Sequence, residues 1–416
     1  MTLEGVSLLA TMSHLLPSPM TRRRFCGGAL ATACATTQIL RAQVAENIHF
    51  NVAEYDRARI LAAAADALKQ APQTVTATAA PAKALEPNTY YSEDTEWFPA
   101  EGAAKSAYER RQGYTNPQAF TAHRDALVRM NGIVAACVAA WRLTGEAPYA
   151  QHAMLHLRAW FVDAATRMEP SLEHAATIPP ASDGHYRGIE ETVALAETVR
   201  AASFLCAYNG VATEDEAAAL RKWFSDFSAW LDESKKGMIA REAKDRLAIC
   251  WTLQAAECAR FTHNSALALE CSHRFKDKLL RQMNFDGEFP LELHRADAYA
   301  ASLFTLDCLS VTCEVLSTPL ERLWDYTLPD GRGMRSAVAF LFPAMESRAR
   351  WKYPADARHF TDWPVRQPSL LLAGRAFGRG EYLDVWKRLP VEPKSAELLR
   401  TFPVRQPALW TVRPPA

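Results

Sequence analysis

The sequence predicts an all-α fold that is built from helical hairpins. Apolar residues recur at steps of three and four over long runs, which places them on one face of a helix. The joints between these runs are short, as between antiparallel neighbouring helices. Strand patterns are sparse, which argues against βαβ architectures. Hydrophobic residues make up 49% of the 416 residues, enough to bury a substantial core.

The N-terminus carries an export pattern. Thr21-Arg22-Arg23-Arg24-Phe25 fits the twin-arginine motif, and an apolar run from Cys26 to Leu40 follows it. This run is too short to span a bilayer. Residues 1–42 are therefore predicted to be a cleavable twin-arginine signal peptide, followed by one domain over residues 43–416. The mature protein is expected in the periplasm or outside the cell, free of the membrane, unless Cys34 is lipidated.

Charge and cysteine content narrow the functional classes. Lys plus Arg and Asp plus Glu both number 47, so the net charge is zero. A dedicated nucleic-acid binder would need a basic surplus, whereas an acidic glycan needs only a few arginines in one cleft. The seven cysteines after the signal lie at helical spacings without a metal-binding motif, and they are predicted to be buried free thiols.

The first part of the mature chain is predicted to be largely irregular. A helix is expected over residues 55–69 and a short strand over Thr74 to Thr78. Proline, asparagine and acidic residues then dominate to about Pro117, and the stretch holds aromatic residues that include Trp97 and Phe98. Long irregular segments in compact domains are often functional.

Long helices are predicted from Asn116 onward. Asn116-Pro117 is a favourable helix start, and Gly145 ends the run. A capping box at Thr213 starts a later helix. The other helices are expected at about 149–161, 189–205, 246–262, 265–283, 296–317 and 333–346.

One internal repeat is evident near the C-terminus. Trp363-Pro364-Val365-Arg366-Gln367-Pro368-Ser369-Leu370 echoes Phe402-Pro403-Val404-Arg405-Gln406-Pro407-Ala408-Leu409. The second proline of each copy is expected to begin a helical turn over the aromatic residue and the leucine. The echo indicates two equivalent corners of one scaffold.

Several motifs, in order along the chain, resemble the alginate lyase domain family. They are Tyr114-Thr115-Asn116-Pro117, Ala122-His123-Arg124, Leu157 to Phe161, Phe289 to Arg295, Tyr299, Ser302 to Asp307, Leu328 to Arg335, and Trp363 to Pro368. The resemblance covers roughly residues 50–412. It implies an incomplete α/α toroid with a long cleft, and cleavage of uronate-containing polysaccharides by β-elimination. No cofactor is implied, and the expected partner is an acidic polysaccharide or oligosaccharide bound by a monomer.

The chain departs from the family at the expected catalytic positions. β-Elimination needs donors that neutralise the uronate carboxylate, a base for the C5 proton and an acid for the leaving O4. Similar lyases use an Asn-Asn-His tract and a tyrosine. This chain carries Asp245, Arg246 and Leu247 in place of the tract, and Ala301 where the tyrosine is expected.

Other residues could supply the chemistry. Arg295 and Tyr299 are four apart and would share one helix face, where the cation would favour tyrosinate as a base. The turn-rich loop 183–188 offers His185 as a base and Arg187 as a carboxylate clamp. The remaining candidates are Arg246 for catalysis and Trp97, Tyr186, Asp245 and Trp251 for substrate binding.

Each candidate also has a purely structural interpretation. Arg295 could begin a helix and Tyr299 could pack, the loop could be simple surface, and the aromatic residues could anchor the irregular segment. His123 and His156 lie in helical runs and are predicted to be packing histidines. Three functions therefore remain: an exported polysaccharide lyase, a catalytically degenerate glycan-binding relative, and a glycoside hydrolase with two facing carboxylates.

Overall fold

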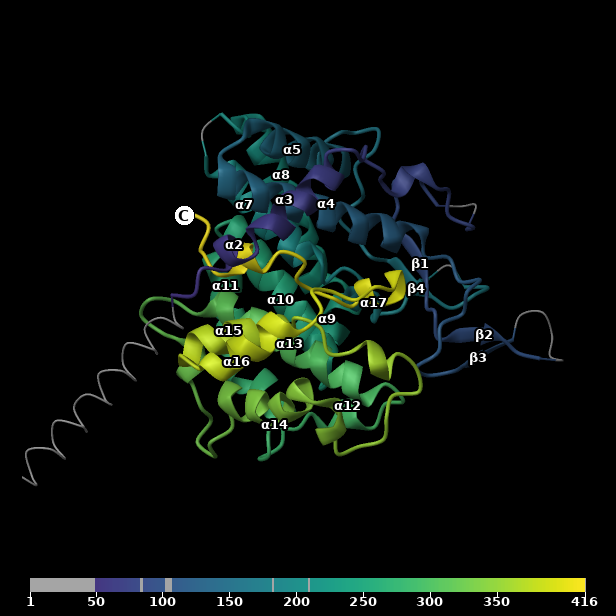
Figure 1. Ribbon diagram of the computed structural model, residues 1–416. Coiled ribbons are helices and arrows are strands. Elements are labelled where there is room, and N and C mark those ends of the chain that lie inside the picture. The colour runs from purple at the N-terminus through teal and green to yellow at the C-terminus, as the bar shows by residue number, and fades with distance from the viewer. Residues whose placement is uncertain (1–48, 83–84, 102–106, 182, 209, 416) are drawn as a thin grey trace, which may run out of the picture.

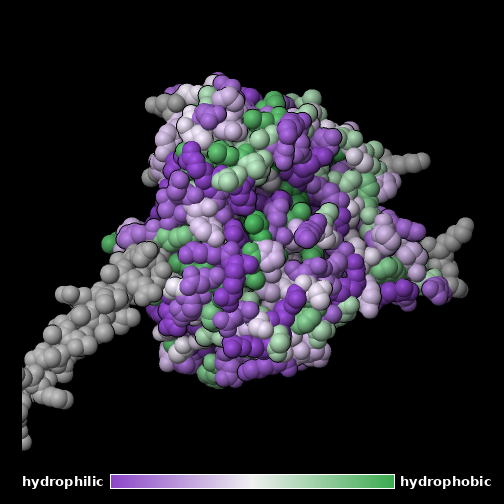
Figure 2. Space-filling view, in the orientation of Figure 1, coloured by the Kyte–Doolittle hydropathy of each residue, from purple (hydrophilic) through white to green (hydrophobic). Residues whose placement is uncertain are grey.

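The computed structural model describes residues 49–415 apart from 83–84, 102–106, 182 and 209. The predicted signal peptide and Cys34 lie outside the described residues. The described chain consists mainly of helices in two layers, so the predicted all-α class is confirmed (Figure 1). Figure 2 shows the same side of the molecule hollowed near its centre, with hydrophilic side chains around the hollow.

An inner row of helices forms the core, each packed against the next. In order these are α4 (Ala122–Thr144), α7 (Leu195–Cys206), α10 (Arg246–Phe261), α13 (Ala298–Leu316) and α15 (Pro368–Phe377). Helices α4 and α13 are apolar enough to cross a bilayer, but most of each is buried inside the fold, as in core helices of soluble proteins.

The outer layer covers this row. It consists of α3 (Arg57–Ala67), α5 (Ala147–Phe161), α8 (Glu214–Glu233), α11 (Ser265–Asp277), α14 (Met334–Glu346) and α16 (Gly380–Arg388). Short helices join the hairpins: α2 (Val52–Tyr55), α6 (Gly188–Glu191), α9 (Lys235–Arg241), α12 (Pro290–Leu293) and α17 (Ala396–Leu399). The predicted run 189–205 is therefore broken into α6 and α7.

Helix ends follow the capping chemistry at most positions. Gly145 ends α4 in the left-handed conformation with φ of 77°, and Thr213 with Glu216 forms the capping box of α8. The expected start at Asn116 is wrong, because α4 begins at Ala122. Asn116 instead accepts a hydrogen bond from the Gln118 N–H, and its own N–H donates to the Thr95 carbonyl, so it forms a turn.

Four short strands occupy the segment expected to be irregular. Strand β1 (Tyr91–Glu93) pairs in parallel with β4 (His174–Thr177), and β2 (Trp97–Pro99) pairs antiparallel with β3 (Tyr108–Arg110). The expected strand at Thr74 to Thr78 is wrong: residues 75–77 form a 3₁₀ turn, which the Thr74 hydroxyl caps by accepting from the Thr76 N–H.

The two copies of the repeat lie beside one another. The Trp363 and Phe402 ring centroids are 6.4 Å apart. The second proline begins α15 in one copy and the 3₁₀ turn Pro407–Trp410 in the other, as predicted. Each copy also donates backbone hydrogen bonds to a buried carboxylate of an inner helix: one N–H of the first copy bonds Asp307, and two of the second bond Glu197. They are thus equivalent corners of the scaffold.

The cysteines in the described part of the chain are free thiols. Six of the seven described cysteines are buried, and Cys206 is half-buried. This agrees with the packing expected from their helical spacings.

The buried Asp307 carboxyl predicts a pH-dependent stability. Burial raises the pKa of Asp307 to about 7, against the hydrogen bonds from Ser369. The folded state therefore keeps a proton that the unfolded chain loses above about pH 4, so stability falls as pH rises toward 7. Asp307→Asn should leave stability at pH 4 unchanged and raise the free energy of unfolding at pH 8 by about 2–4 kcal/mol. Urea denaturation at both pH values measures this, and an equal change at both would contradict it.

Candidate active site

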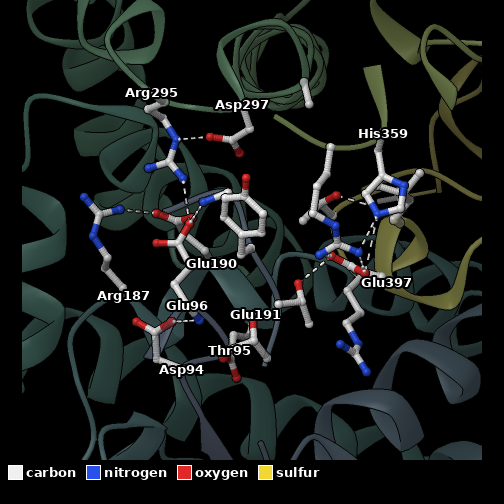
Figure 3. Close-up of a pocket in the computed structure, with 18 of the residues that line it drawn as sticks. Asp94, Thr95, Glu96, Arg187, Glu190, Glu191, Arg295, Asp297, His359 and Glu397 are labelled. Carbon is white, nitrogen blue, oxygen red and sulfur yellow. Dashed lines mark hydrogen bonds and ion pairs between the residues drawn. The ribbon is translucent and has the colours of Figure 1, made fainter. Parts of the chain in front are cut away.

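A cavity of about 200 Å³ opens where three inner helices begin. Arg124 lies in the first turn of α4, Arg246 begins α10, and Ala300 lies in the first turn of α13. The N-terminal end of a helix carries partial positive charge, so three such ends at one cavity favour an anion. The remaining walls come from residues 94–96 between β1 and β2, from the end of β3 and the loop after it, from β4 and α6, and from the segments around residues 358–363 and 397–401 (Figure 3).

Arginines and carboxylates line the cavity in nearly equal numbers. The seven arginines are Arg110, Arg124, Arg187, Arg246, Arg295, Arg358 and Arg400. The six carboxylates are Asp94, Glu96, Glu190, Glu191, Asp297 and Glu397. A substrate carboxylate would therefore bind to those guanidinium groups that the protein's own carboxylates leave incompletely paired.

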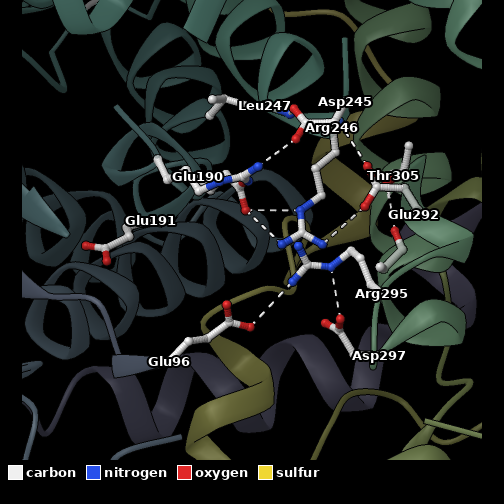
Figure 4. A network of polar contacts seen from close by, with 12 residues as sticks. Glu96, Glu190, Glu191, Asp245, Arg246, Leu247, Glu292, Arg295, Asp297 and Thr305 are labelled. Atoms are coloured by element: carbon white, nitrogen blue, oxygen red, sulfur yellow. Dashed lines mark hydrogen bonds and ion pairs between the residues drawn. The ribbon is translucent and has the colours of Figure 1, made fainter. Parts of the chain in front are cut away.

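A chain of alternating charges forms one wall (Figure 4). Arg187 bonds Asp245 and Glu190, each at 2.7 Å. Arg246 contacts Glu190 at 2.9 Å and Glu292 at 3.5 Å. These two predicted arginines thus lie in one network, but both are strongly engaged by carboxylates.

Within this network the pKa values of Glu190 and Glu292 are shifted in opposite directions. Burial acts to raise the pKa of Glu190, but Arg246, Arg187 and Arg295 outweigh it and hold that pKa below its ordinary value. For Glu292, burial prevails over Arg246 and the pKa is raised. Glu190 is therefore a fixed anion that keeps Arg246 and Arg187 in place.

Asp245 plays two structural roles in this wall. Its carboxylate caps α10 by accepting from the Leu247 N–H at 3.1 Å, and it pairs with Arg187. The charge of Asp245 is thus offset by Arg187, whereas the neighbouring Arg246 pairs with Glu190. Asp245 does not line the cavity, so it acts on a ligand only through that arginine.

Arg295 lines the cavity, but Tyr299 does not. Arg295 precedes α13, and its Nε donates to Asp297 at 2.9 Å while its Nη2 lies 3.6 Å from Glu96. Tyr299 lies inside α13, fully buried, and its hydroxyl donates to the Ala344 carbonyl at 2.9 Å. The expected shared helix face is wrong because the helix begins only at Ala298. Burial also raises the pKa of Tyr299, which opposes a tyrosinate base.

Arg124 is a functional candidate that the site prediction missed. Its side chain is 13% exposed and its only described charge partner is Glu191, at 3.8 Å. The buried Nε bonds no described residue. Burial raises the pKa of Glu191, although Arg124 and the hydroxyls of Ser92 and Tyr90 act to lower it. The motif Ala122-His123-Arg124 was the one sequence signal for it.

The other predicted residues lie around the cavity rather than in it. The His185 ring stacks on Tyr186 with centroids 3.8 Å apart, and its Nδ1 accepts from the Arg187 N–H. Trp97 is half-buried in β2, and its carbonyl accepts from the Asn116 side chain. Trp251 is fully buried and donates to the Leu231 carbonyl, so it is a core residue.

The two substituted catalytic positions offer no proton-transfer group. Leu247 is fully buried in α10, and Ala301 is buried in α13. His123 and His156 are packed and bonded to backbone carbonyls, as predicted, with burial lowering the pKa of His156 to about 4.

Two side chains with transferable protons do line the cavity, and both were missed as site residues. Tyr114 is 49% exposed, and no described residue bonds its hydroxyl. His359 lies in the loop between α14 and α15 and contacts Asp362, Arg358 and Glu397. Its loop lies more than 40 residues after the end of α13, so only the folded chain brings it here.

Comparisons with known proteins agree with this architecture. The alginate lyase family model matches residues 74–351. An alginate lyase from Bacteroides ovatus has a crystal structure that superposes with a TM-score of 0.75 at 24% identity, covering 88% of this chain and 97% of that chain. Alginate lyase A1-III from Sphingomonas species A1 superposes with a TM-score of 0.51 at 16% identity, covering 83% and 88%.

The comparison with curated proteins found no match. At these low identities the superpositions are evidence about the fold alone, and they confirm the predicted α/α toroid. The family match spans more than half of the sequence, so the chain belongs to the alginate lyase family.

Proposed function

We propose that this protein is an exported polysaccharide lyase that cleaves a uronate-containing glycan by β-elimination. The observation that carries the proposal is the position of two incompletely paired arginines, Arg124 and Arg295, in a cavity at three helix N-termini. Family membership supports the reaction class. The twin-arginine pattern at Thr21 to Phe25 supports a periplasmic or secreted location.

The arginines suit the electronic demand of the reaction. Loss of the C5 proton moves negative charge onto the neighbouring carboxylate, and preorganised cations stabilise that charge. Arg295 is held at its Nε by Asp297, and no described residue accepts a hydrogen bond from its Nη1. Its planar guanidinium can therefore present donors to a carboxylate while its base stays fixed.

A panel of uronate polymers tests the reaction class. The purified protein is expected to release products with the ultraviolet absorbance of a C4=C5 unsaturated uronate from at least one polymer. The matched control is the same polymer with its carboxylates reduced to alcohols, which should give no product. New reducing ends without unsaturation would instead establish a hydrolase and contradict the proposal.

A binding-only relative is the second candidate. The burial of Leu247 and Ala301 favours it, because neither position supplies a proton-transfer group. It predicts tight binding of a uronate polymer without any product. Binding by calorimetry with no turnover over long incubation would favour this function over the lyase.

A further inference from the structure

We propose that His359, oriented by Asp362, is the base that removes the C5 proton, in place of the base that this chain lacks. The inference rests on the proposed lyase function and names the residue that performs its central step. It follows from the contacts of His359, its backbone conformation and its position opposite Arg295.

The contacts of His359 fix its tautomer. Its Nδ1 lies 2.8 Å from Asp362 Oδ2, and its Nε2 lies 3.1 Å from Arg358 Nη2. An ionised carboxylate only accepts hydrogen bonds and a guanidinium only donates them. The neutral ring must therefore carry its proton on Nδ1 and its lone pair on Nε2. A base oriented by a carboxylate through its other nitrogen is the arrangement that activates histidine in many enzymes.

Carboxylates lie on both sides of the His359 ring. Glu397 Oε2 lies 3.5 Å from Nε2, and Asp362 lies on the other side of the ring. Arg358 is the opposing charge, but it forms two bonds of its own to Glu397, at 3.1 and 3.0 Å. When a substrate C–H group takes the place of Arg358 at His359 Nε2, Arg358 therefore stays bonded to Glu397. An imidazolium formed there would lie between two carboxylates.

The backbone at His359 is held in a conformation that side chains rarely adopt. Its φ is 60°, and only two other non-glycine residues in the described part of the chain have positive φ, Ala176 and His263. Ala176 lines the same cavity. A left-handed conformation costs a non-glycine residue about 1–3 kcal/mol and clusters at functional sites. The surrounding structure therefore holds the backbone of His359 in this conformation.

His359 and Arg295 lie on opposite sides of the cavity. Figure 3 shows His359 and Glu397 on one wall and Arg187, Arg295 and Asp297 on the other. A sugar ring between these walls could direct its carboxylate toward Arg295 and its C5–H bond toward His359.

His359 alone can carry out both proton transfers of the elimination. Nε2 takes the C5 proton, the C5–H electron pair forms the C4=C5 bond, and the C4–O4 bond breaks. The imidazolium then returns the proton to the departing O4. The products are a saturated fragment and an unsaturated one, and the histidine is neutral again. Asp362 does not touch the substrate and is a positioning residue.

The test compares three variants of the full-length protein on the polymer that the wild type cleaves. His359→Gln should lower kcat by about 10²–10⁴-fold with little change in KM, because the base acts in the transition state. Asp362→Asn should lower kcat less and move the acidic limb of the pH–rate profile to lower pH, since a carboxylate beside the ring is lost. His263→Gln is the matched control, because His263 also has a positive φ (57°) but does not line the cavity. It should keep wild-type kinetics.

Chemical rescue separates catalysis from folding. His359→Gly suits the positive φ and leaves space for a small base. Added imidazole should restore part of its kcat and should not affect the wild type. If His359→Gln retains activity within about threefold of a wild type that makes unsaturated products, His359 is not the base, although the protein is a lyase. Absence of rescue in a folded His359→Gly variant would also overturn the assignment. If the wild type makes no unsaturated product from any polymer, both proposals fall.

Discussion

Arg295→Ala is expected to lower kcat/KM on the cleaved polymer by about 10²–10³-fold, as for removal of one preorganised donor to a developing oxyanion. The side chain lines the cavity, and its Nη1 is free of described acceptors. Its removal should leave the fold stable, because Glu96 and Asp297 remain partly exposed, at 18% and 29%. Steady-state rates from ultraviolet absorbance measure the effect.

Two variants make this result specific. Arg295→Lys keeps the charge but loses the planar fork, so it should recover only part of the activity. Arg335→Ala removes an arginine that is 58% exposed and outside the cavity, and it should leave kinetics unchanged. If Arg295→Ala kept wild-type kinetics, Arg295 would have no role in substrate binding or catalysis.

Arg246→Met is expected to lower the free energy of unfolding by about 3–5 kcal/mol. The guanidinium is 12% exposed and lies between Glu190 and Glu292. Its loss leaves two buried carboxylates facing each other without the cation that offsets their repulsion. Urea denaturation measures the change. The matched control is Arg350→Met, which breaks a surface pair in which the arginine is 60% exposed and should change stability by less than about 1 kcal/mol.

A double variant isolates the charge pairing. Adding Glu190→Gln to Arg246→Met removes one of the stranded carboxylate charges. The pair should therefore be less destabilised than the sum of the single variants. Strict additivity would show that Arg246 stabilises the fold by packing over Phe304, 5.5 Å away, rather than by pairing.

The helices were predictable from the sequence because their signals are local. The capping box at Thr213 and the glycine at 145 act through bonds within a few residues, and both ends lie where the pattern placed them. Asn116-Pro117 has the same local signature but forms a turn. Its backbone N–H bonds Thr95, a partner that only the folded chain supplies.

Only the arginines of the site were predictable from the sequence. Arg187, Arg246 and Arg295 were expected in the cleft and line the cavity. Tyr299 was misplaced because its helix begins only at Ala298, so Arg295 lies outside the helix and the two side chains do not share a face. His359 gave no sequence signal, since its partner Glu397 is 38 residues away and joins it only after folding.

A crystal structure of the His359→Gln variant with a bound uronate oligosaccharide tests the central claim most directly. We expect a sugar carboxylate to contact Arg295 or Arg124, and the C5–H bond of that sugar to face residue 359. An oligosaccharide bound elsewhere on the protein, or one whose carboxylates avoid both arginines, would contradict the account.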